Sequence, residues 1–330
     1  MKTVLLIAGL RQRYYYDPFL KACETKELRI CIFDPNQFPS YASISVALDI
    51  HGILTGFVDV LEYKLGEMKN CRLFIQDIDI AWYLREDSTP TKDSDSSLEN
   101  RFSDNESRGA IRSFFSVLKC KWVNRKETVD FLASNKLYQQ LIAQQAGLLV
   151  PNTLTGNDAK SVVNFSDPEE GLLLKSIGYI KLDDEGRKFL YSQRFSHDEI
   201  IRLAEAIRQC PIFCQEYVQK LYEYRVMVIG DKVLACRIDS QASEKTKVDW
   251  RHYDFENVEH TPVELPSNIQ KNLLRFMKAV DLQYGAIDLI ETPKRQFVFL
   301  EINPSGQWGW IADFARLPIP EAVAEMLETL

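Results

Sequence analysis

The pattern of apolar and polar residues predicts short strands that alternate with helices at the N-terminal end of the chain. Apolar runs at residues 3–8 and 29–33 predict two buried strands, and residues 18–27 between them predict a helix. A strand–helix–strand order is typical of a parallel α/β sheet. Further strands of this region are predicted at residues 53–58, 71–75 and 81–85.

The pattern changes at residue 87. Residues 87–109 are rich in Ser, Asp, Glu and Asn, and Leu98 and Phe102 are almost their only apolar positions. A segment with so little apolar surface cannot bury a core of its own. We therefore expect a mobile surface insertion here, followed by a helix at residues 111–123 that completes a first domain, residues 1–123.

The remaining chain predicts a second region of mixed strands and helices. Asn135 can cap a helix at residues 136–145, which stops at Gly147. A further helix is predicted at residues 197–208, and strands are predicted at residues 172–176, 189–192, 212–218, 223–229 and 232–238. We divide this region into domains of residues 124–213 and 214–330.

A predicted β-hairpin at residues 285–304 carries candidate chemistry. A two-residue loop inside the turn 292–295 places Asp288 directly opposite Glu301, and a four-residue loop still leaves both on one face. Asn303 joins them at the period of a strand. Two carboxylates and an amide oxygen on an apolar sheet require a counter-charge. A divalent cation such as Mg²⁺ would supply it, and so would Lys or Arg partners on a solvated face.

Composition limits the classes of function. The 330 residues carry a net charge of −7, which argues against nucleic acid or an anionic membrane as the main partner. The seven cysteines form no CxxC pair and cluster with none of the four histidines, so we expect no zinc site and a reduced, cytoplasmic setting. No apolar run approaches the length of a membrane span.

Six features then follow one another in a fixed order. They are Lys136 at a helix start, Lys175 at the end of an apolar strand, the strand 214–219, Glu223 with Arg225, Arg237 on a further strand, and the hairpin with Asp288, Glu301 and Asn303. As an ordered set they resemble the ATP-grasp superfamily, whose fold holds a nucleotide between two α+β lobes. The resemblance covers residues 124–310, and the N-terminal α/β segment is similar in type to the family's pre-grasp domain. It implies a central lobe at residues 124–213 and a C-terminal lobe with the metal and catalytic residues at 214–330.

The resemblance implies ATP and Mg²⁺ as cofactors and a role for each candidate residue. Lys136 and Lys175 would contact the α- and β-phosphates. The backbone around Tyr217 and Val218, in the run Gln215, Glu216, Tyr217 and Val218, would hydrogen-bond adenine, and Glu223 would accept hydrogen bonds from the ribose. Arg225 and Arg237 would neutralise the γ-phosphate and an acyl phosphate formed from it. Asp288, Glu301 and Asn303 would hold Mg²⁺.

Three runs narrow the resemblance to the microviridin-type peptide ligases, or graspetide synthetases: residues 247–251, 284–290 and 299–308. This branch implies a ligase that activates Asp or Glu side chains of a ribosomal precursor peptide as acyl phosphates. It would join them to Ser, Thr or Lys side chains as macrocyclic ω-esters or ω-amides. Arg251, with Arg237, would suit an acidic core peptide because guanidinium groups bind carboxylates in a bidentate way. The leader of the precursor would bind the central lobe at residues 178–208.

Two alternatives remain at this point. One is a carboxylate–amine ligase of the same fold that acts on a free amino acid or a protein tail. The other is a non-catalytic nucleotide-binding module, against which the complete set of candidate residues counts. The sequence also departs from many ATP-grasp enzymes, because only Gly178 stands where a Gly-rich phosphate loop follows the second lysine. A homodimer is common among such folds.

Overall fold

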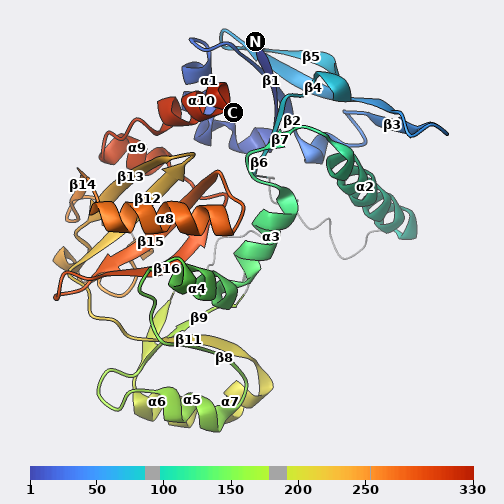
Figure 1. Cartoon of the computed structure of the whole chain (residues 1–330). Coiled ribbons are helices and arrows are strands. Elements are labelled where there is room, and N and C mark those ends of the chain that lie inside the picture. The colour runs from blue at the N-terminus through green and yellow to red at the C-terminus, as the bar shows by residue number, and fades with distance from the viewer. Residues whose placement is uncertain (86–96, 178–191, 253) are drawn as a thin grey trace. The chain divides into compact units, whose positions relative to one another are not determined.

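The computed structural model describes residues 1–85, 97–177, 192–252 and 254–330. The chain forms two compact units (Figure 1). Unit 1 comprises residues 1–126 and 318–330, and unit 2 comprises residues 127–317. The last helix of the chain therefore belongs to the N-terminal unit. The division into three domains at residues 123 and 213 stays a prediction.

Within its described residues, unit 1 holds one mixed sheet in the order β3-β4-β2-β1-β6-β7, with β5 paired to β4. The strands are β1 (Lys2–Ala8), β2 (Leu28–Phe33), β3 (Ile44–Leu48), β4 (Leu54–Lys64), β5 (Glu67–Phe74), β6 (Ile80–Arg85) and β7 (Lys121–Trp122). β1 pairs in parallel with β2 and β6, as predicted, but β4 pairs antiparallel with β2, β3 and β5. A tight turn with positive φ at Leu65 and Gly66 joins β4 to β5. Such a turn can only join antiparallel strands, because a parallel pair needs a long crossover.

Helices of unit 1 correct one expectation. α1 (Asp17–Cys23) contacts α10 (Ile319–Thr329), and α2 spans Leu98–Val117. Residues 98–109, which we expected to belong to a mobile surface insertion, form the first part of α2, whereas residues 87–96 lie outside the described part of the chain. The Oγ atom of Ser97 accepts a hydrogen bond from Asn100 N at 3.3 Å and caps the helix. Buried residues such as Phe114 and Phe115 anchor only its second half, so the polar first half needs no apolar face.

In unit 2, the first sheet is antiparallel and is called here the small sheet. Among the described residues its order is β10-β9-β11-β8, with β8 (Thr153–Gly156), β9 (Leu172–Lys175), β10 (Gln193–Phe195) and β11 (Ile212–Glu216). α5 (Ala159–Phe165), α6 (His197–Arg202) and α7 (Ala204–Gln209) lie along one side of it (Figure 1). The core between these helices and the sheet contains Val162, Leu172, Ile200, Ile207 and Cys214. The helix predicted at residues 197–208 is thus two short helices separated at Leu203.

The second sheet of unit 2, called here the large sheet, is also antiparallel. In the described residues its order is β14-β13-β12-β15-β16, with β12 (Tyr222–Ile229), β13 (Lys232–Ile238), β14 (His260–Val263), β15 (Tyr284–Glu291) and β16 (Phe297–Asn303). The remaining helices of unit 2 are α3 (Lys126–Ser134), α4 (Lys136–Gln145), α8 (Ser267–Ala279) and α9 (Gly309–Phe314). α4 and α8 cover one face of this sheet, which leaves the other face to the small sheet.

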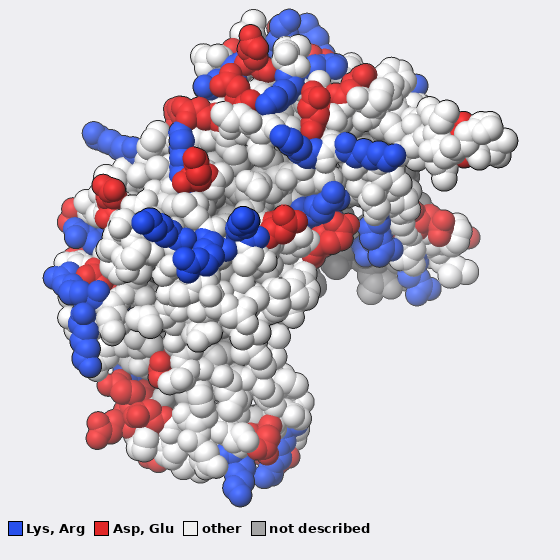
Figure 2. All heavy atoms as spheres, in the orientation of Figure 1, with Lys and Arg blue, Asp and Glu red and all other residues white. Residues whose placement is uncertain are grey.

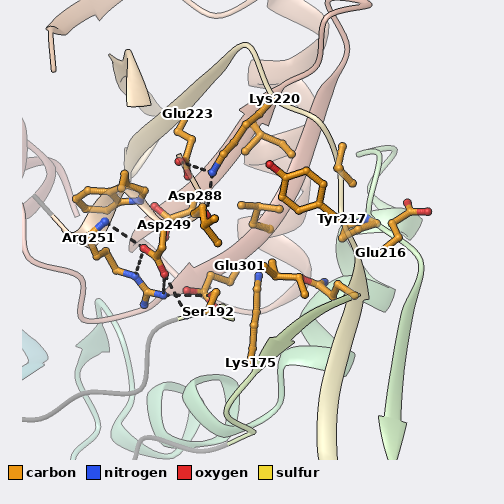
Figure 3. A pocket seen from close by; sticks show the side chains of 18 residues that line it. Lys175, Ser192, Glu216, Tyr217, Lys220, Glu223, Asp249, Arg251, Asp288 and Glu301 are labelled. Atoms are coloured by element: carbon orange, nitrogen blue, oxygen red, sulfur yellow. Dashed lines mark hydrogen bonds and ion pairs between the residues drawn. The ribbon is translucent and has the colours of Figure 1, made fainter. Parts of the chain in front are cut away.

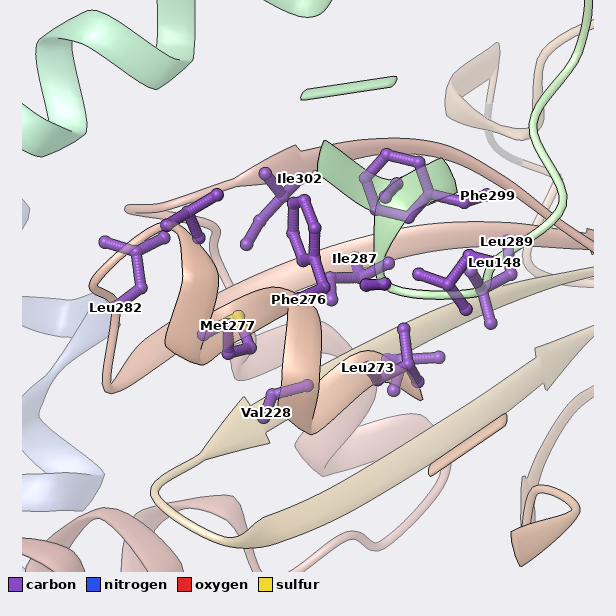
Figure 4. Close-up of a cluster of buried hydrophobic side chains, with 14 of the residues drawn as sticks. Leu148, Val228, Leu273, Phe276, Met277, Leu282, Ile287, Leu289, Phe299 and Ile302 are labelled. Atoms are coloured by element: carbon purple, nitrogen blue, oxygen red, sulfur yellow. The ribbon is translucent and has the colours of Figure 1, made fainter. Parts of the chain in front are cut away.

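The helix-covered face of the large sheet holds the main core of unit 2. Phe276 on α8 and Phe299 on β16 lie with ring centroids 5.0 Å apart, and both are fully buried (Figure 4). The opposite side of α8 is basic, and Figure 2 shows Lys and Arg side chains gathered over this helix. Its exposed basic residues are Lys271, Arg275 and Lys278. The helix is therefore amphipathic, with its apolar face toward the sheet.

The register of the β15–β16 hairpin depends on a loop length and a β-bulge that the sequence did not predict. Residues 293–295 form a three-residue loop, with Arg295 at φ 61° and Thr292 N bonded to Gln296 O, so neither predicted loop length is observed. On this register alone, Asp288 would lie opposite Leu300. A β-bulge at Leu300 shifts the pairing by one residue, and Asp288 lies opposite Glu301, as predicted. The bulge therefore keeps the two carboxylates on one face.

We expect Phe276→Ala to lower the free energy of unfolding of unit 2 by about 3–5 kcal/mol, because it leaves a cavity beneath the large sheet. Chemical denaturation followed by tryptophan fluorescence measures this change. Leu141→Ala on the exposed side of α4 is the control and should change the stability by less than about 1 kcal/mol. Equal stability of the two variants would contradict this account of the core.

Candidate active site

A cleft between the small and large sheets of unit 2 contains most of the predicted site residues. It holds about 620 Å³ of empty space, including the part that opens to solvent. The small sheet contributes Lys175 and Gln215, and the large sheet contributes Glu223, Asp288 and Glu301. The other predicted residues that line it are Glu216, Tyr217, Val218 and Arg251. Residues far apart in the sequence thus meet in one place (Figure 3).

Asp288 and Glu301 form the acidic part of the cleft, and each has a cationic partner. Arg225 Nη1 lies 3.0 Å from Asp288 Oδ1, and Lys136 Nζ lies 3.0 Å from Glu301 Oε2. Burial raises the pKa of Asp288, against the effect of Arg225. Burial would also raise the pKa of Glu301, but Lys136, Lys175 and Arg251 hold it well below its usual range. Glu301 is therefore ionised at every physiological pH.

Lys136 is held beside Glu301 by the way α4 attaches to β16. Three residues further along α4, Gln139 is buried, and its side-chain amide donates to Ile302 O at 3.1 Å and accepts from Ile302 N at 2.9 Å. The helix thus completes the hydrogen bonding of the edge strand. The prediction that Asn135 caps this helix was wrong, because its side chain makes no capping hydrogen bond and donates to Phe131 O instead.

The acidic set suits a divalent metal ion. Asn303 is exposed at the end of β16 and pairs with Ala286, so it lies on the same face as Glu301. Its Oδ1 accepts a hydrogen bond from Ser305 N at 3.1 Å. No group of three or more His, Cys, Asp or Glu residues suited to a metal occurs among the described residues. Two carboxylates and one amide oxygen fit Mg²⁺, which commonly takes few protein ligands and completes its shell with water and phosphate oxygens.

Lys175 and Arg251 supply positive charge opposite these carboxylates. Burial lowers the pKa of Lys175 to about 8, helped by Lys136 and Arg251 and opposed by Glu301. Figure 3 shows its side chain rising from β9 toward Glu301. This arrangement of cations and carboxylates has the chemistry to bind an anion together with a metal ion.

Asp249 is a site residue that the sequence analysis missed. It is buried and accepts hydrogen bonds from Arg251 N at 3.0 Å and Arg251 Nε at 2.8 Å, and a further one from Arg251 Nη2. It also accepts one from Ser192 N at 3.2 Å, next to the small sheet. Asp249 thereby fixes the guanidinium of Arg251 in the cleft. Its position two residues before Arg251, within the run 247–251, is the sequence signal that could have identified it.

Side chains of the predicted adenine strand are mostly engaged. Glu216 accepts hydrogen bonds from Asn152 N at 3.0 Å and Asn152 Nδ2 at 2.7 Å, which connects the end of β11 to the residue before β8. The ring of Tyr217 lies 4.0 Å from the guanidinium of Arg194. Tyr217 and Val218, which follow β11, line the cleft. Apolar side chains complete this region of the cleft: Pro151, Leu173, Val218, Ile290 and Leu300.

No protein-family model and no curated protein matches the chain. Solved structures match along its whole length. Macrocyclase MdnC from Microcystis aeruginosa MRC, bound with the precursor peptide MdnA, is 26% identical with a TM-score of 0.80, over 99% of this chain and 100% of that one. An ATP-grasp ligase associated with a ribosomal peptide from Chryseobacterium gregarium, in complex with ADP and a leader and core peptide, is 22% identical with a TM-score of 0.85 over 99% and 96%. The ATP-grasp ligase PsnB, complexed with a precursor variant, Mg and ADP, is 17% identical with a TM-score of 0.74 over 100% of both chains.

This chain has the fold of the ATP-grasp peptide ligases. The expected combination of an α/β N-terminal part and α+β lobes is confirmed. The small sheet with α5–α7 and the large sheet with α4 and α8 are the two lobes on either side of the cleft. None of the described helices is long and apolar enough to cross a membrane.

Arg237 does not belong to the ATP-grasp cleft, and its prediction as a site residue was wrong. On β13 it pairs with Tyr224, whereas Arg225 pairs with Cys236. Successive strand residues point to opposite faces, so Arg237 lies on the helix-covered face and Arg225 on the cleft face. The guanidinium of Arg237 lies 4.6 Å from the ring centroid of Tyr222. The sequence shows that an arginine occupies this strand but does not show which face it takes.

We expect Gly306→Ala to disturb the Arg225–Asp288 pair. A Cβ atom at residue 306 would lie 2.7 Å from Arg225 Nη2 and 2.3 Å from the Cβ atom of Ala286. Such overpacking should lower the free energy of unfolding by about 1–3 kcal/mol. Thermal denaturation measures the loss. Gly309→Ala is the matched control, because a Cβ there meets no atom within 4 Å, and a loss of the same size in that variant would refute the steric argument.

Proposed function

We propose that the protein is an ATP-dependent ligase that joins Asp or Glu side chains of a ribosomal precursor peptide to its Ser, Thr or Lys side chains, as macrocyclic ω-esters or ω-amides. The observation that carries this proposal is the charge arrangement of the cleft. Asp288 and Glu301 lie beside Lys136, Lys175 and Arg251, which provides for a metal ion and for phosphate oxygens in one place. The likeness to MdnC and to the Chryseobacterium ligase supports a peptide as the substrate.

The nucleotide would lie along the length of the cleft. Its adenine would meet the backbone of Tyr217 and Val218 among the apolar side chains, and its ribose would meet Glu223. The phosphates would extend toward Lys175 and Arg251, and Figure 3 shows Arg251 on the other side of the cleft from Tyr217. Asp288, Glu301 and Asn303 would hold Mg²⁺, which when bound neutralises phosphate oxygens. PsnB, a structure of the same fold, contains Mg and ADP.

The cations of the cleft would then serve phosphoryl and acyl transfer. A carboxylate oxygen of the peptide attacks the γ-phosphorus, the bond to the β-phosphate oxygen breaks, and ADP leaves. A hydroxyl or amine of the same peptide attacks the carbonyl carbon of the acyl phosphate. The bond between this carbon and the phosphate oxygen breaks, and the phosphate leaves with the proton of the nucleophile. Lys175 and Arg251 stabilise the charge on the transferred group, because catalysis of phosphoryl transfer is mainly positioning and electrostatic stabilisation. Each ring closure removes one water from the peptide.

The setting follows from this chemistry. We propose that the enzyme works in the cytoplasm, where ATP and ribosomal precursors are present and where its cysteines, all free, stay reduced. The homodimer remains a prediction. The leader site predicted at residues 178–208 lies partly outside the described residues, because residues 178–191 are not described.

Mass spectrometry of a precursor peptide with enzyme, ATP and Mg²⁺ tests the proposal. We expect the wild-type protein to remove one water for each link from an acidic, Thr-rich peptide encoded beside its gene. Glu301→Gln should remove none, because it lacks a carboxylate for the metal ion. The exposed Glu264→Gln is the matched control and should act like wild type. Full activity of Glu301→Gln would overturn the metal assignment, and wild-type protein that modifies only free amino acids would favour the carboxylate–amine ligase.

A comparison of two arginines tests the corrected site. We expect Arg251→Ala to lower kcat for ring closure by about 100-fold, the order found when one donor to a developing anion is removed. Arg237→Ala should change kcat by less than about twofold, because its side chain lies on the far face of the sheet. Steady-state release of phosphate measures both. Equal losses in the two variants would contradict the strand register.

A further inference from the structure

Lys220 and Glu223 form a buried ion pair on the wall of the cleft. Lys220 Nζ lies 2.7 Å from Glu223 Oε1, and the two side chains are only 6% and 5% exposed. Lys220 Nζ also donates a hydrogen bond to Val248 O at 3.0 Å. A lysine that is buried away from water needs acceptors of this kind to replace its hydrogen bonds to water. Lys220 is therefore fixed between a carboxylate of β12 and a carbonyl of the segment that leads to Asp249.

The pair lies where the sugar of a bound nucleotide would lie. In Figure 3, Tyr217 marks the proposed adenine end of the cleft, and Arg251 with Asp249 marks the proposed phosphate end. Lys220 and Glu223 lie between these two ends. In a nucleotide the ribose separates base from phosphates, so a nucleotide in this orientation presents its hydroxyls to Glu223.

We propose that Lys220 is a positioning residue for ribose recognition, which holds the Glu223 carboxylate in the orientation that accepts hydrogen bonds from the ribose hydroxyls. This inference rests on the proposed nucleotide site. Lys220 contacts Oε1 of Glu223, and a carboxylate has further acceptor positions on both oxygens. Lys220 thus orients the group without using up its capacity to accept.

Lys220 also opposes the protonation of Glu223. Burial raises the pKa of Glu223 and nearby Asp249 raises it too, whereas Lys220 and a hydrogen bond with Ser240 lower it. A protonated carboxyl is a weaker acceptor and donates a hydrogen bond of its own. Removal of Lys220 should raise this pKa further. Ribose recognition should then weaken as the pH falls, because the acceptor becomes protonated.

A purely structural role for Lys220 makes a different prediction. If Lys220 only secured the segment around Val248, its loss would lower the stability of the protein and would weaken the binding of every nucleotide to the same degree. The ratio of affinities for ribose and deoxyribose nucleotides separates the two roles. Only a positioning residue for the ribose changes that ratio.

The test is a calorimetric titration with ADP, 2′-deoxy-ADP and 3′-deoxy-ADP in the presence of Mg²⁺, without peptide. We expect the wild type to prefer ADP over at least one deoxy analogue by about tenfold, the effect of one hydrogen bond to a charged group. K220Q should lose most of this preference, and K220R, which keeps a cation, should retain part of it. K271Q, on the exposed face of α8, is the matched control and should behave like wild type.

Two further arms complete the test. E223Q should lose the preference, and K220Q/E223Q should lose no more than E223Q, because Lys220 acts through Glu223. In K220Q, the preference should partly return as the pH is raised and Glu223 ionises, because burial without a cationic partner favours the protonated carboxyl at lower pH. Where K220Q is too unstable to titrate, the preferences of E223Q and K220R test the role of Lys220.

The outcomes separate this inference from the proposed function. Wild-type protein that binds no adenine nucleotide refutes the proposed function itself. Wild-type protein that binds all three nucleotides equally overturns only the inference. The role of Lys220 is also overturned if K220Q keeps the wild-type preference unchanged. Where K220Q cannot be titrated, full wild-type preference in E223Q or K220R has the same meaning.

Discussion

The attraction between two carboxylates and four cations decides how this site is built. Asp288 and Glu301 lie on a sheet face that is otherwise largely apolar, where an unpaired carboxylate would cost several kcal/mol. Arg225 and Lys136 contact them directly, and Lys175 and Arg251 lower the pKa of Glu301 further. Each lobe contributes to this balance, because Lys175 belongs to the small sheet and the carboxylates to the large one. The same balance gives the cleft its capacity for a metal ion and phosphates together.

Backbone geometry makes this charge arrangement possible. The bulge at Leu300 turns Glu301 toward Asp288, and Leu300 itself lines the cleft. Two successive residues of one strand thus serve the same face, which a regular strand does not allow. On the other face, Phe299 packs against Phe276 and holds the hairpin on α8. The core and the site therefore share one short stretch of β16.

Buried polar pairs orient the functional side chains of the cleft. Asp249 fixes Arg251, Gln139 fixes the start of α4 and so Lys136, and Lys220 contacts Glu223. In each case a buried hydrogen bond holds a functional side chain, or the helix that carries it, in one orientation. Groups held in this way lose little further conformational freedom when a ligand binds. This arrangement suits a site whose catalysis depends on position and charge.

The sequence by itself determined the residue types, their order, and the strands that carry them. It predicted that Asp288 and Glu301 share one face, because alternation along a strand constrains which residues can do so. It could not predict the bulge, the face of Arg237, or the roles of Asp249 and Lys220. The tertiary structure decided these, because the register between strands depends on loop geometry and bulges, and a shift of one residue reverses the face of every side chain. The first half of the helix at Leu98–Val117 escaped prediction for a related reason, since an exposed polar helix has little of the apolar pattern on which sequence analysis relies.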